Sequence, residues 1–476
     1  MTEPAAPERR IGPATISYLV VFVAAVVAAA TTGKVFHGEG GKEGLVLFNG
    51  TVPLEFVFFV LTLVGVALLH NHTLQVAVAG LGSVLAYKLA FIDSFHLGHH
   101  LFADGPGNNV FDYCFGSGDV GEWRVIVNLL GLLLGFGLLA KYFEESDVPK
   151  WIPKILPDTG PWGGFVLLIY VFVLSSFLDN IAAAMIGGVI ARSVFRGKVT
   201  IGFVAAIVAA SNAGGAFSVV GDTTTTMMWI DGVPAANVFH GIVACVVALC
   251  CFGLFAGAQQ QKYSPIIIEK KGEKVPIDGV RLFIVALILA GAIVANFMLN
   301  FPAAGVWAAI LVAAFMRKPA WGEIPGAVKG ASFLLSLVLC ASMMPVKALP
   351  PAGPSTAFGL GFVSAVFDNI PLTNLALHQG GYDWGMLAFT VGFGGSMIWF
   401  GSSAGVAISK DYPEARNTWQ YVKQGWFVTF AYVIGFTAQY YLVPWEAPAP
   451  HKEKEKGALI KQPDGEKDKK AEEKPK

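Results

Sequence analysis

Three aspartates stand inside long apolar segments of the sequence, at Asp179, Asp222 and Asp368. An ionised carboxylate at membrane depth costs at least about 2.5 kcal/mol on insertion scales, so each one needs a physical reason. Each has an amide or a hydroxyl beside it, and hard cations prefer carboxylate, amide, hydroxyl and carbonyl oxygens. The aspartates therefore predict a cation site. A helix cap or a structural hydrogen bond is the competing interpretation, above all for Asp222.

Asp222 belongs to the stretch "SNAGGAFSVVGDTTTT", which covers residues 211–226. We expect the span to unwind here, because glycine lets a helix break and frees backbone carbonyls to act as ligands. On a helix that restarts after Asp222, only one or two of the four threonines can face the site, and threonines often bond back to the backbone instead. The stretch offers these candidate residues: Ser211, Asn212, Gly214, Gly215, Gly221, Asp222, and either Thr223 or Thr224.

A buried carboxylate can also carry a proton, because burial disfavours its charged form. A bound sodium ion would favour the charged form again. A carboxylate that holds either a proton or a sodium ion, but not both, is sufficient for exchange, because each of the two cargoes then drives the other.

The composition indicates the medium in which these groups work. The 476 residues are 54% hydrophobic and only 14% charged, and the mean hydropathy is +0.59. Soluble domains carry roughly 25% charged residues, so we expect a membrane protein whose main partner is the lipid bilayer. The net charge of zero offers no basic face for nucleic acid. No phosphate loop, nucleophile elbow or dinucleotide fingerprint occurs in the required context, so neither an enzyme nor a cofactor is expected.

Apolar runs predict eleven spans and two re-entrant hairpins. The hairpin at 161–191 has Lys or Arg on both sides, which places both its ends in the cytoplasm, whereas the hairpin at 355–378 has none. The N-terminus is expected inside and the acidic loop 93–123 outside. The spans are expected at 15–32, 52–70, 73–92, 125–143, 201–229, 236–257, 281–299, 302–316, 330–349, 385–409 and 426–444.

The two hairpins carry similar sequences, "SSFLDNIAAAM" from Ser175 and "SAVFDNIPLTN" from Ser364. Each is followed about 30 residues later by a Gly- and Ser-rich break in a span, which indicates a duplication. Five spans per copy is an odd number, so the second copy is inverted. The expected organisation is all-helical: an N-terminal span and outer loop (1–51), a first repeat (52–257, broken span 201–229), a cytoplasmic linker (258–280), a second repeat (281–444, broken span 385–409) and a disordered charged tail (445–476).

The segments "FLDNI", "SNAGGAFSVVGDTTTTMMW", "FDNIPLT" and "GGSMIWFGSSAGVA" resemble the ion transporter superfamily. They are most similar to the NhaD-type sodium/proton antiporters and to the citrate-transporter-like and ArsB-like permeases, over about 125–240 and 355–445. The resemblance implies inverted repeats around a cation site that works by alternating access. It carries functional roles to Asp179, Asn180, Asn212, Asp222, Thr223, Asp368, Asn369, Ser402 and Ser403, while Thr373 completes the candidate set. The expected sodium ligands are Asp179, Asn180, Asn212, Asp222, Asp368 and Asn369.

The most favoured function is Na⁺(Li⁺)/H⁺ antiport by a multi-pass protein of the plasma membrane, the inner membrane in a bacterium. A sodium-coupled di- or tricarboxylate carrier and an oxyanion permease are the alternatives, although three Asp and no intramembrane Arg favour a cation as sole cargo. A remote alternative is a membrane metalloenzyme that uses the "HLGHH" histidines His96, His99 and His100, with His70 and His72 elsewhere. The sequence leaves the oligomeric state open, with a homodimer among the expectations.

Overall fold

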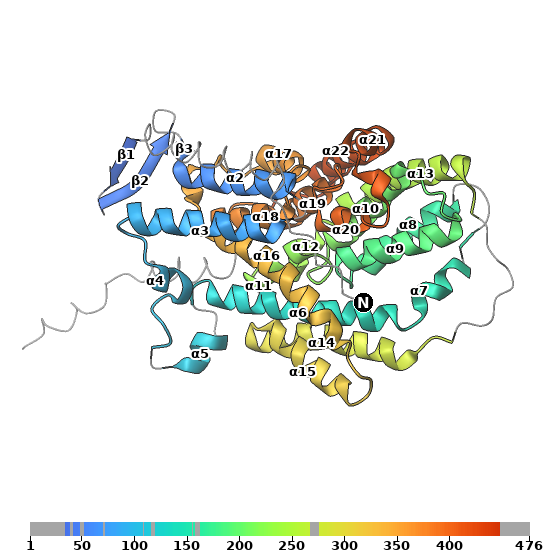
Figure 1. Ribbon diagram of the computed structural model, residues 1–476, viewed down its shortest axis with the longest axis horizontal. Coiled ribbons are helices and arrows are strands. Elements are labelled where there is room, and N and C mark those ends of the chain that lie inside the picture. The colour runs from blue at the N-terminus through green and yellow to red at the C-terminus, as the bar shows by residue number, and fades with distance from the viewer. Residues whose placement is uncertain are drawn as a thin grey trace, which may run out of the picture.

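The structure is a computed structural model that describes residues 34–38, 41–47, 52–69, 72–107, 109–115, 120–154, 156–157, 162–266 and 276–447. The span expected at 15–32 lies outside the described residues, as do nearly all of the expected charged tail and much of the linker. The described chain is mainly helical, and α2, α3, α6, α14 and α15 run roughly along the longest axis of the molecule (Figure 1).

Five helical segments among the described residues are long and apolar enough to cross a membrane, and several shorter apolar helices accompany them. The chain is therefore a multi-pass membrane protein. The total of eleven spans stays a prediction. The five long segments are Thr73–Phe91, Trp123–Glu144, Ala235–Tyr263, Gly279–Leu299 and Trp321–Ser342.

The remaining elements connect or pair with these segments. In the first half of the chain the helices are α2 (Leu54–Leu68), α3 (Thr73–Phe91), α4 (Leu97–Phe102), α5 (Val110–Phe115), α6 (Trp123–Glu144), α7 (Val148–Trp151), α8 (Trp162–Ser175), α9 (Asn180–Val194), α10 (Ile201–Gly215), α11 (Thr223–Ile230), α12 (Ala235–Phe239) and α13 (Ile242–Tyr263). In the second half they are α14 (Gly279–Leu299), α15 (Pro302–Ala314), α16 (Ile324–Ser342), α17 (Pro354–Ser364), α18 (Asn369–Gln379), α19 (Trp384–Gly394), α20 (Ser403–Ile408), α21 (Thr418–Gln424) and α22 (Trp426–Leu442). Short 3₁₀ helices cover Ile152–Lys154, Trp321–Glu323, Val346–Ala348 and Pro413–Arg416.

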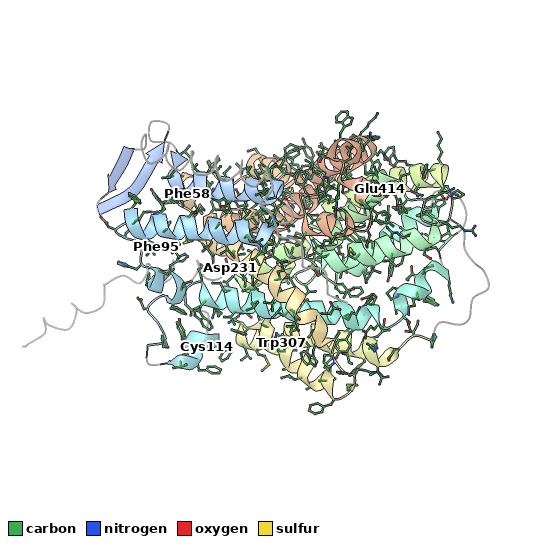
Figure 2. The ribbon with its side chains drawn as sticks, viewed as in Figure 1. Phe58, Phe95, Cys114, Asp231, Trp307 and Glu414 are labelled. Atoms are coloured by element: carbon green, nitrogen blue, oxygen red, sulfur yellow. The ribbon has the colours of Figure 1, made fainter. Side chains whose placement is uncertain are left out.

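A small antiparallel sheet, which the sequence analysis did not expect, precedes α2. Its strands are β1 (Lys34–Gly38), β2 (Gly41–Leu47) and β3 (Val52–Pro53), in that order, with Lys34 opposite Val46. The strands lie beside α2 and α3 at the end of the molecule that also carries α4 and α5 (Figure 1), and we call this the sheet end. The opposite end carries α7, and we call it the α7 end. Figure 2 labels Phe95 and Cys114 towards the sheet end and Glu414 towards the α7 end.

Two helical hairpins and two interrupted helices occupy the middle of the fold. In the first hairpin α8 and α9 are joined by residues 176–179, and in the second α17 and α18 are joined by 365–368. The chain leaves helical geometry at 216–222, between α10 and α11, and at 395–402, between α19 and α20. Both breaks lie inside the spans in which the sequence predicted them.

Close backbone packing explains why glycines flank the break after α10. A Cβ on Gly214 would lie 2.1 Å from the carbonyl oxygen of Phe172 in α8, and one on Gly215 would lie 2.6 Å from the carbonyl oxygen of Gly221. Neither contact leaves room for a side chain. The same tight approach recurs in the second half, where a Cβ on Gly394 would lie 2.4 Å from the carbonyl oxygen of Gly361 in α17.

A serine ties each hairpin to its neighbouring interrupted helix. The Ser175 hydroxyl donates to the carbonyl oxygen of Ser211 at 2.6 Å, and the Ser364 hydroxyl donates to the carbonyl oxygen of Val391 at the same distance. Each serine stands four residues before the aspartate of its hairpin, Asp179 or Asp368. The two hairpins are therefore held to the interrupted helices by the same contact at the same place in the chain.

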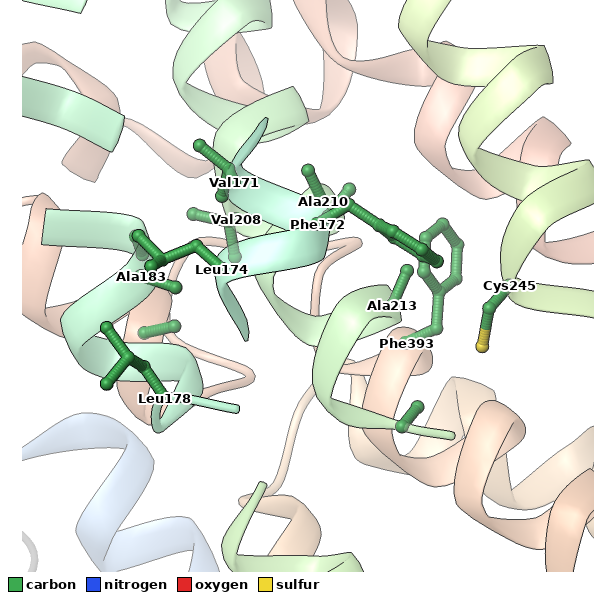
Figure 3. Close-up of a cluster of buried hydrophobic side chains, with 14 of the residues drawn as sticks. Val171, Phe172, Leu174, Leu178, Ala183, Val208, Ala210, Ala213, Cys245 and Phe393 are labelled. Carbon is green, nitrogen blue, oxygen red and sulfur yellow. The ribbon is translucent and has the colours of Figure 1, made fainter. Parts of the chain in front are cut away.

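The two helices that enter the breaks are enclosed almost completely. In α10 every residue from Gly202 to Gly215 is buried, and in α19 every residue is buried. Figure 3 shows part of the surrounding cluster, in which side chains of α8, α9, α10, α13 and α19 pack together. A helix buried on all sides cannot be displaced without disturbing its neighbours, so α10 and α19 hold the two breaks in fixed positions.

The α14/α15 pair tests how close helix packing supports this fold. A Cβ on Gly305 of α15 would lie 1.9 Å from the carbonyl oxygen of Gly291 of α14. We expect Gly305→Ala to lower the free energy of unfolding in detergent by about 1–3 kcal/mol, the usual cost of overpacking. Thermal denaturation of the purified variant measures this effect. The matched control is Gly359→Ala in α17, where nothing lies within 4 Å of the added Cβ, and equal melting of the two variants would contradict the prediction.

Candidate functional site

All three aspartates predicted to lie in the site begin a helix. Asp179 precedes α9 and accepts from the Ile181 amide at 3.2 Å, and Asp368 precedes α18 and accepts from the Ile370 amide at 3.0 Å. Asp222 precedes α11, and its Oδ1 accepts from the Thr224 amide at 3.0 Å. The capping interpretation is therefore right for one oxygen of each carboxylate. The positive end of each helix also favours a negative charge at this position.

The second oxygen of Asp222 takes part in a network of amides. The Asn180 side chain, at the start of α9, donates to Asp222 Oδ2 at 3.0 Å and to Asn212 Oδ1 at 3.1 Å. Asn212 in turn donates to the Ser396 hydroxyl at 2.9 Å. This chain of hydrogen bonds joins the tip of the first hairpin to the break after α10 and to the break after α19. Buried polar groups must be satisfied in this way, and Asn212 and Ser396 are both fully buried.

Ser396 is a residue of this network that the sequence analysis missed. It stands in the "GGS" of the second break, so its place beside the paired glycines was the available signal. The position became meaningful only once the structure brought the second break against Asn212.

Asp368 makes a separate arrangement in the second hairpin. Its Oδ2 accepts from the Ser403 hydroxyl at 3.2 Å, which joins the tip of that hairpin to the start of α20. Asn369 follows it and is buried. The two hairpins thus place an Asp-Asn pair at equivalent tips. The residue that precedes α11 in the first half is Asp222, and the residue that precedes α20 in the second half is Ser402. The first hairpin tip therefore faces a second carboxylate across its break, whereas the second hairpin tip does not.

Several other predicted site residues bond to nearby backbone. The Ser211 hydroxyl donates to the carbonyl oxygen of Val208, the Thr373 hydroxyl donates to that of Asn369, and the Ser402 hydroxyl accepts from the Gly405 amide. These three side chains stabilise their own helices. Gly214 and Gly215 serve the close packing described above.

The four threonines after Asp222 make different contacts. Thr225 and Thr226 donate to carbonyl oxygens of the break, of Ser218 at 2.6 Å and Val219 at 2.9 Å respectively, which ties the unwound segment to α11. The Thr224 hydroxyl is fully buried and has no hydrogen-bond partner among the described residues. Thr223 lines a cavity beside Asp179 and Asp222. The Thr224 side chain therefore differs from those of Thr225 and Thr226 in not being bonded to a backbone carbonyl oxygen, and it interacts with the neighbouring Asp222 carboxylate.

That cavity has a volume of about 280 Å³. Its polar lining comes from Asp179, Asp222, Thr223 and Thr226, and apolar and small side chains of α6, α9 and α16 form most of the rest. A second cavity of about 890 Å³ shares Gly137, Ala140 and Ala182 with it and reaches α7. Its charged lining residues are Lys141, Glu144, Glu145, Lys150, Lys154, Arg196 and Glu323.

The histidines of the outer loop lie apart from this site. The His99 ring lies 3.5 Å from the exposed carboxylate of Asp104, and the His100 ring forms a 3.0 Å hydrogen bond with Ser342 at the end of α16. Burial lowers the pKa of His100, although the nearby Glu122 carboxylate acts in the opposite direction. His96 precedes α4, and His70 lies outside the described residues. Within the described ranges no group of three or more His, Cys, Asp or Glu is placed to hold a metal ion.

The fold and the site define a multi-pass membrane protein in which a cavity is lined by two carboxylates, the buried Asp222 and the half-buried Asp179. No family model matches the sequence. The chain is similar to Sodium/proton antiporter 1 of Arabidopsis thaliana, with 27% identity over 473 residues that cover 88% of this chain and 76% of that protein. It is also similar to Sodium/proton antiporter 2 of the same organism, with 27% identity over 361 residues that cover 66% of this chain and 80% of that protein.

Loss of the Ser396 hydroxyl should weaken the network measurably. We expect Ser396→Ala to lower the free energy of unfolding by about 1–3 kcal/mol, because the Asn212 amide is left buried without its acceptor. Thermal melting in detergent reports the change. The control is Ser176→Ala, which removes an exposed hydroxyl bonded within its own turn. Ser396 would have no part in the network if both variants melted like the parent.

The anchoring of α4 should depend on pH through His100. A histidine whose pKa is lowered by folding stabilises the folded form fully above its unfolded value of about 6.5, and this contribution is lost as the pH falls. We therefore expect the protection of the amides in 97–102, measured relative to their intrinsic exchange rates, to fall as the pH is lowered from about 7.5 to 5.5. His100→Gln should remove this fall in protection. If the variant kept the full pH response, another group would be responsible.

Proposed function

We propose that this protein is a secondary transporter that exchanges Na⁺ or Li⁺ for H⁺, with both cargoes competing for the carboxylate of Asp222. The observation that carries the proposal is the position of that carboxylate. It is 3% exposed, fixed at a helix start, bonded to a buried amide and bordered by a cavity. The names of the two Arabidopsis relatives support the same function.

The surroundings of Asp222 suit the two loading states. In the sodium-loaded state the carboxylates of Asp222 and Asp179 supply the charge, and the hydroxyls of Thr223, Thr224 and Thr226 supply neutral oxygens. A hydroxyl that donates its hydrogen to a backbone carbonyl, as Thr226 does, still offers its lone pairs to a cation. In the proton-loaded state the same oxygen of Asp222 that would bind sodium carries the proton, so the two cargoes exclude each other.

The scaffold of the proposed transporter is a pair of inverted repeats. The matched hairpins and breaks, each tied by a serine to a carbonyl oxygen, support a duplication. Five spans in each copy give the opposite orientation, and the span at 15–32 completes eleven. The basic loops near the α7 end support a cytoplasmic location for that end. We further propose the plasma membrane, the inner membrane in a bacterium, as the site of action.

The cavity argues against the alternative of an organic-anion or oxyanion permease. An anion site needs hydrogen-bond donors or positive charges, whereas the cavity at Asp222 offers two carboxylates and two hydroxyls as its polar lining. A carboxylate substrate would meet two like charges in a medium of low dielectric constant. A cation as sole cargo therefore fits this site best, and its chemistry requires no bound cofactor and no enzymatic step.

The test uses purified protein in liposomes with an imposed pH gradient and an internal pH dye. Sodium chloride, lithium chloride, potassium chloride and sodium citrate are added outside in separate runs. We expect sodium or lithium chloride alone to collapse the gradient. Asp222→Asn should reduce the initial rate at least about tenfold, because the neutral amide cannot hold the exchanged charge, and tenfold corresponds to about 1.4 kcal/mol. Asp104→Asn, on an exposed side chain of the outer loop, is the matched control and should retain the parent rate.

Two outcomes would contradict the proposal. If the chloride salts had no effect while citrate entered with sodium, the protein would be a coupled anion carrier and the aspartates would bind its driving ion. If Asp222→Asn exchanged sodium as fast as the parent, the competing carboxylate would lie elsewhere.

A further inference from the structure

Two adjacent cavities lie between the α7 end and the aspartates. Gly137 and Ala140 of α6 and Ala182 of α9 line both of them. The larger one is lined at its far end by Lys150 and Lys154, which follow α6 in the loop that the sequence predicts to be cytoplasmic. Asp179 and Asp222 lie at the inner end.

Small residues border part of the inner cavity. From α16 it is lined by Ala327, Gly330 and Ala331 together with Leu334, and from α6 by Gly137 and Ala140 together with larger apolar side chains. A Cβ added to Gly330 would meet nothing within 4 Å. A large side chain at this position would therefore project into open space at the cavity wall.

The opposite side of the site is fixed by polar contacts at the sheet end. The His378 ring, in the last turn of α18, lies 3.2 Å from the Glu122 carboxylate just before α6. Asn374, one turn earlier, donates to the carbonyl oxygen of Val338 in α16 at 2.8 Å. These contacts hold the second hairpin against α6 and α16 at the sheet end.

We propose that the two cavities join into one passage between α6, α9 and α16, that the transported cation reaches Asp179 and Asp222 through it from the cytoplasmic end, and that Gly330 determines its width. The inference rests on the proposed function and adds the route and a residue that controls it. Gly330 belongs to no hairpin and no break, and it donates no ligand. Gly330 contributes by having no side chain. It lies in α16, in the second half of the chain, whereas Asp179 and Asp222 lie in the first half.

The decisive variant is Gly330→Leu, compared with Gly326→Leu. Both glycines belong to α16 and both would place a Cβ in open space, but of the two cavities described above Gly330 borders one and Gly326 borders neither. Both variants leave every proposed ligand unchanged. We expect Gly330→Leu to reduce the initial rate of sodium- or lithium-dependent proton movement in liposomes at least about tenfold, equivalent to about 1.4 kcal/mol. Gly326→Leu should keep a rate within about twofold of the parent, less than about 0.4 kcal/mol.

A second measurement reports the route without relying on transport. Gly330→Cys is exposed to a membrane-impermeant maleimide in inside-out and right-side-out vesicles, in a background that lacks the five native cysteines. We expect Gly330→Cys to be labelled only when the cytoplasmic face is accessible. Gly359→Cys, in α17, is the comparison variant at a position away from the passage. Labelling only from the external face, or a Gly330→Leu rate equal to that of Gly326→Leu, would overturn the proposed route.

These outcomes separate the route from the function. If the parent protein moved no protons in response to sodium or lithium, the proposed function would fail, and cysteine labelling would still decide whether the passage opens to the cytoplasm. If the parent exchanged ions and Asp222→Asn did not, while Gly330→Leu worked normally, the function would stand and the route would be wrong.

Discussion

The arrangement of the site depends on the side-chain amide of Asn180. This one group donates to a carboxylate oxygen of Asp222 and to the amide oxygen of Asn212, and so holds a hairpin tip against an interrupted helix. In an apolar medium an interrupted helix leaves backbone groups without partners, and such a break is tolerated only where other groups satisfy it. The Ser175 hydroxyl on the carbonyl oxygen of Ser211, and the Thr225 and Thr226 hydroxyls on the carbonyl oxygens of the break, supply those partners. The polar residues of the stretch 211–226 are thus required by the backbone geometry as well as by the carboxylate.

The two halves of the chain use the same construction for different purposes. Both hairpins end in Asp-Asn, and both are tied to an interrupted helix by a serine at 2.6 Å. At the position of Asn212 the second half has Gly392, and at the position of Asp222 it has Ser402. A Cβ on Gly392 would lie 3.7 Å from Asp222 Oδ2, so the second half presents bare backbone to the carboxylate of the first. In the proposed transporter the first half would therefore carry most of the exchanged charge, while the second would enclose it.

Much of this arrangement was predictable because helix breaks and buried charges leave strong local signals. Paired glycines, "DN" at a hairpin bend and a carboxylate before a run of threonines each have a physical meaning that does not depend on distant residues. The sequence therefore predicted the helix interruptions at 216–222 and 395–402 and a bend at each Asp-Asn pair. The contribution of Ser396 could not be predicted, because it depends on how the second break packs against α10. The proposed passage past Gly330 and the hydrogen bond between His100 and Ser342 also involve segments far apart in the chain. The small sheet was missed because its strands are short and rich in glycine, a pattern more typical of loops.

The capping contact of Asp222 has a consequence for the speed of the proposed ion exchange. Because Oδ1 accepts from the Thr224 amide and Oδ2 accepts from Asn180, both torsions of the aspartate side chain are fixed before any ion arrives. The Asp222 carboxylate then needs no conformational search when an ion binds. The entropy lost in ordering this side chain is lost once, on folding, and not in each cycle of the proposed transport. A side chain held in this way acts as a rigid part of α11. In the proposed transporter, any movement of this charge relative to the membrane must therefore be a movement of whole helices, in which the carboxylate moves together with α11.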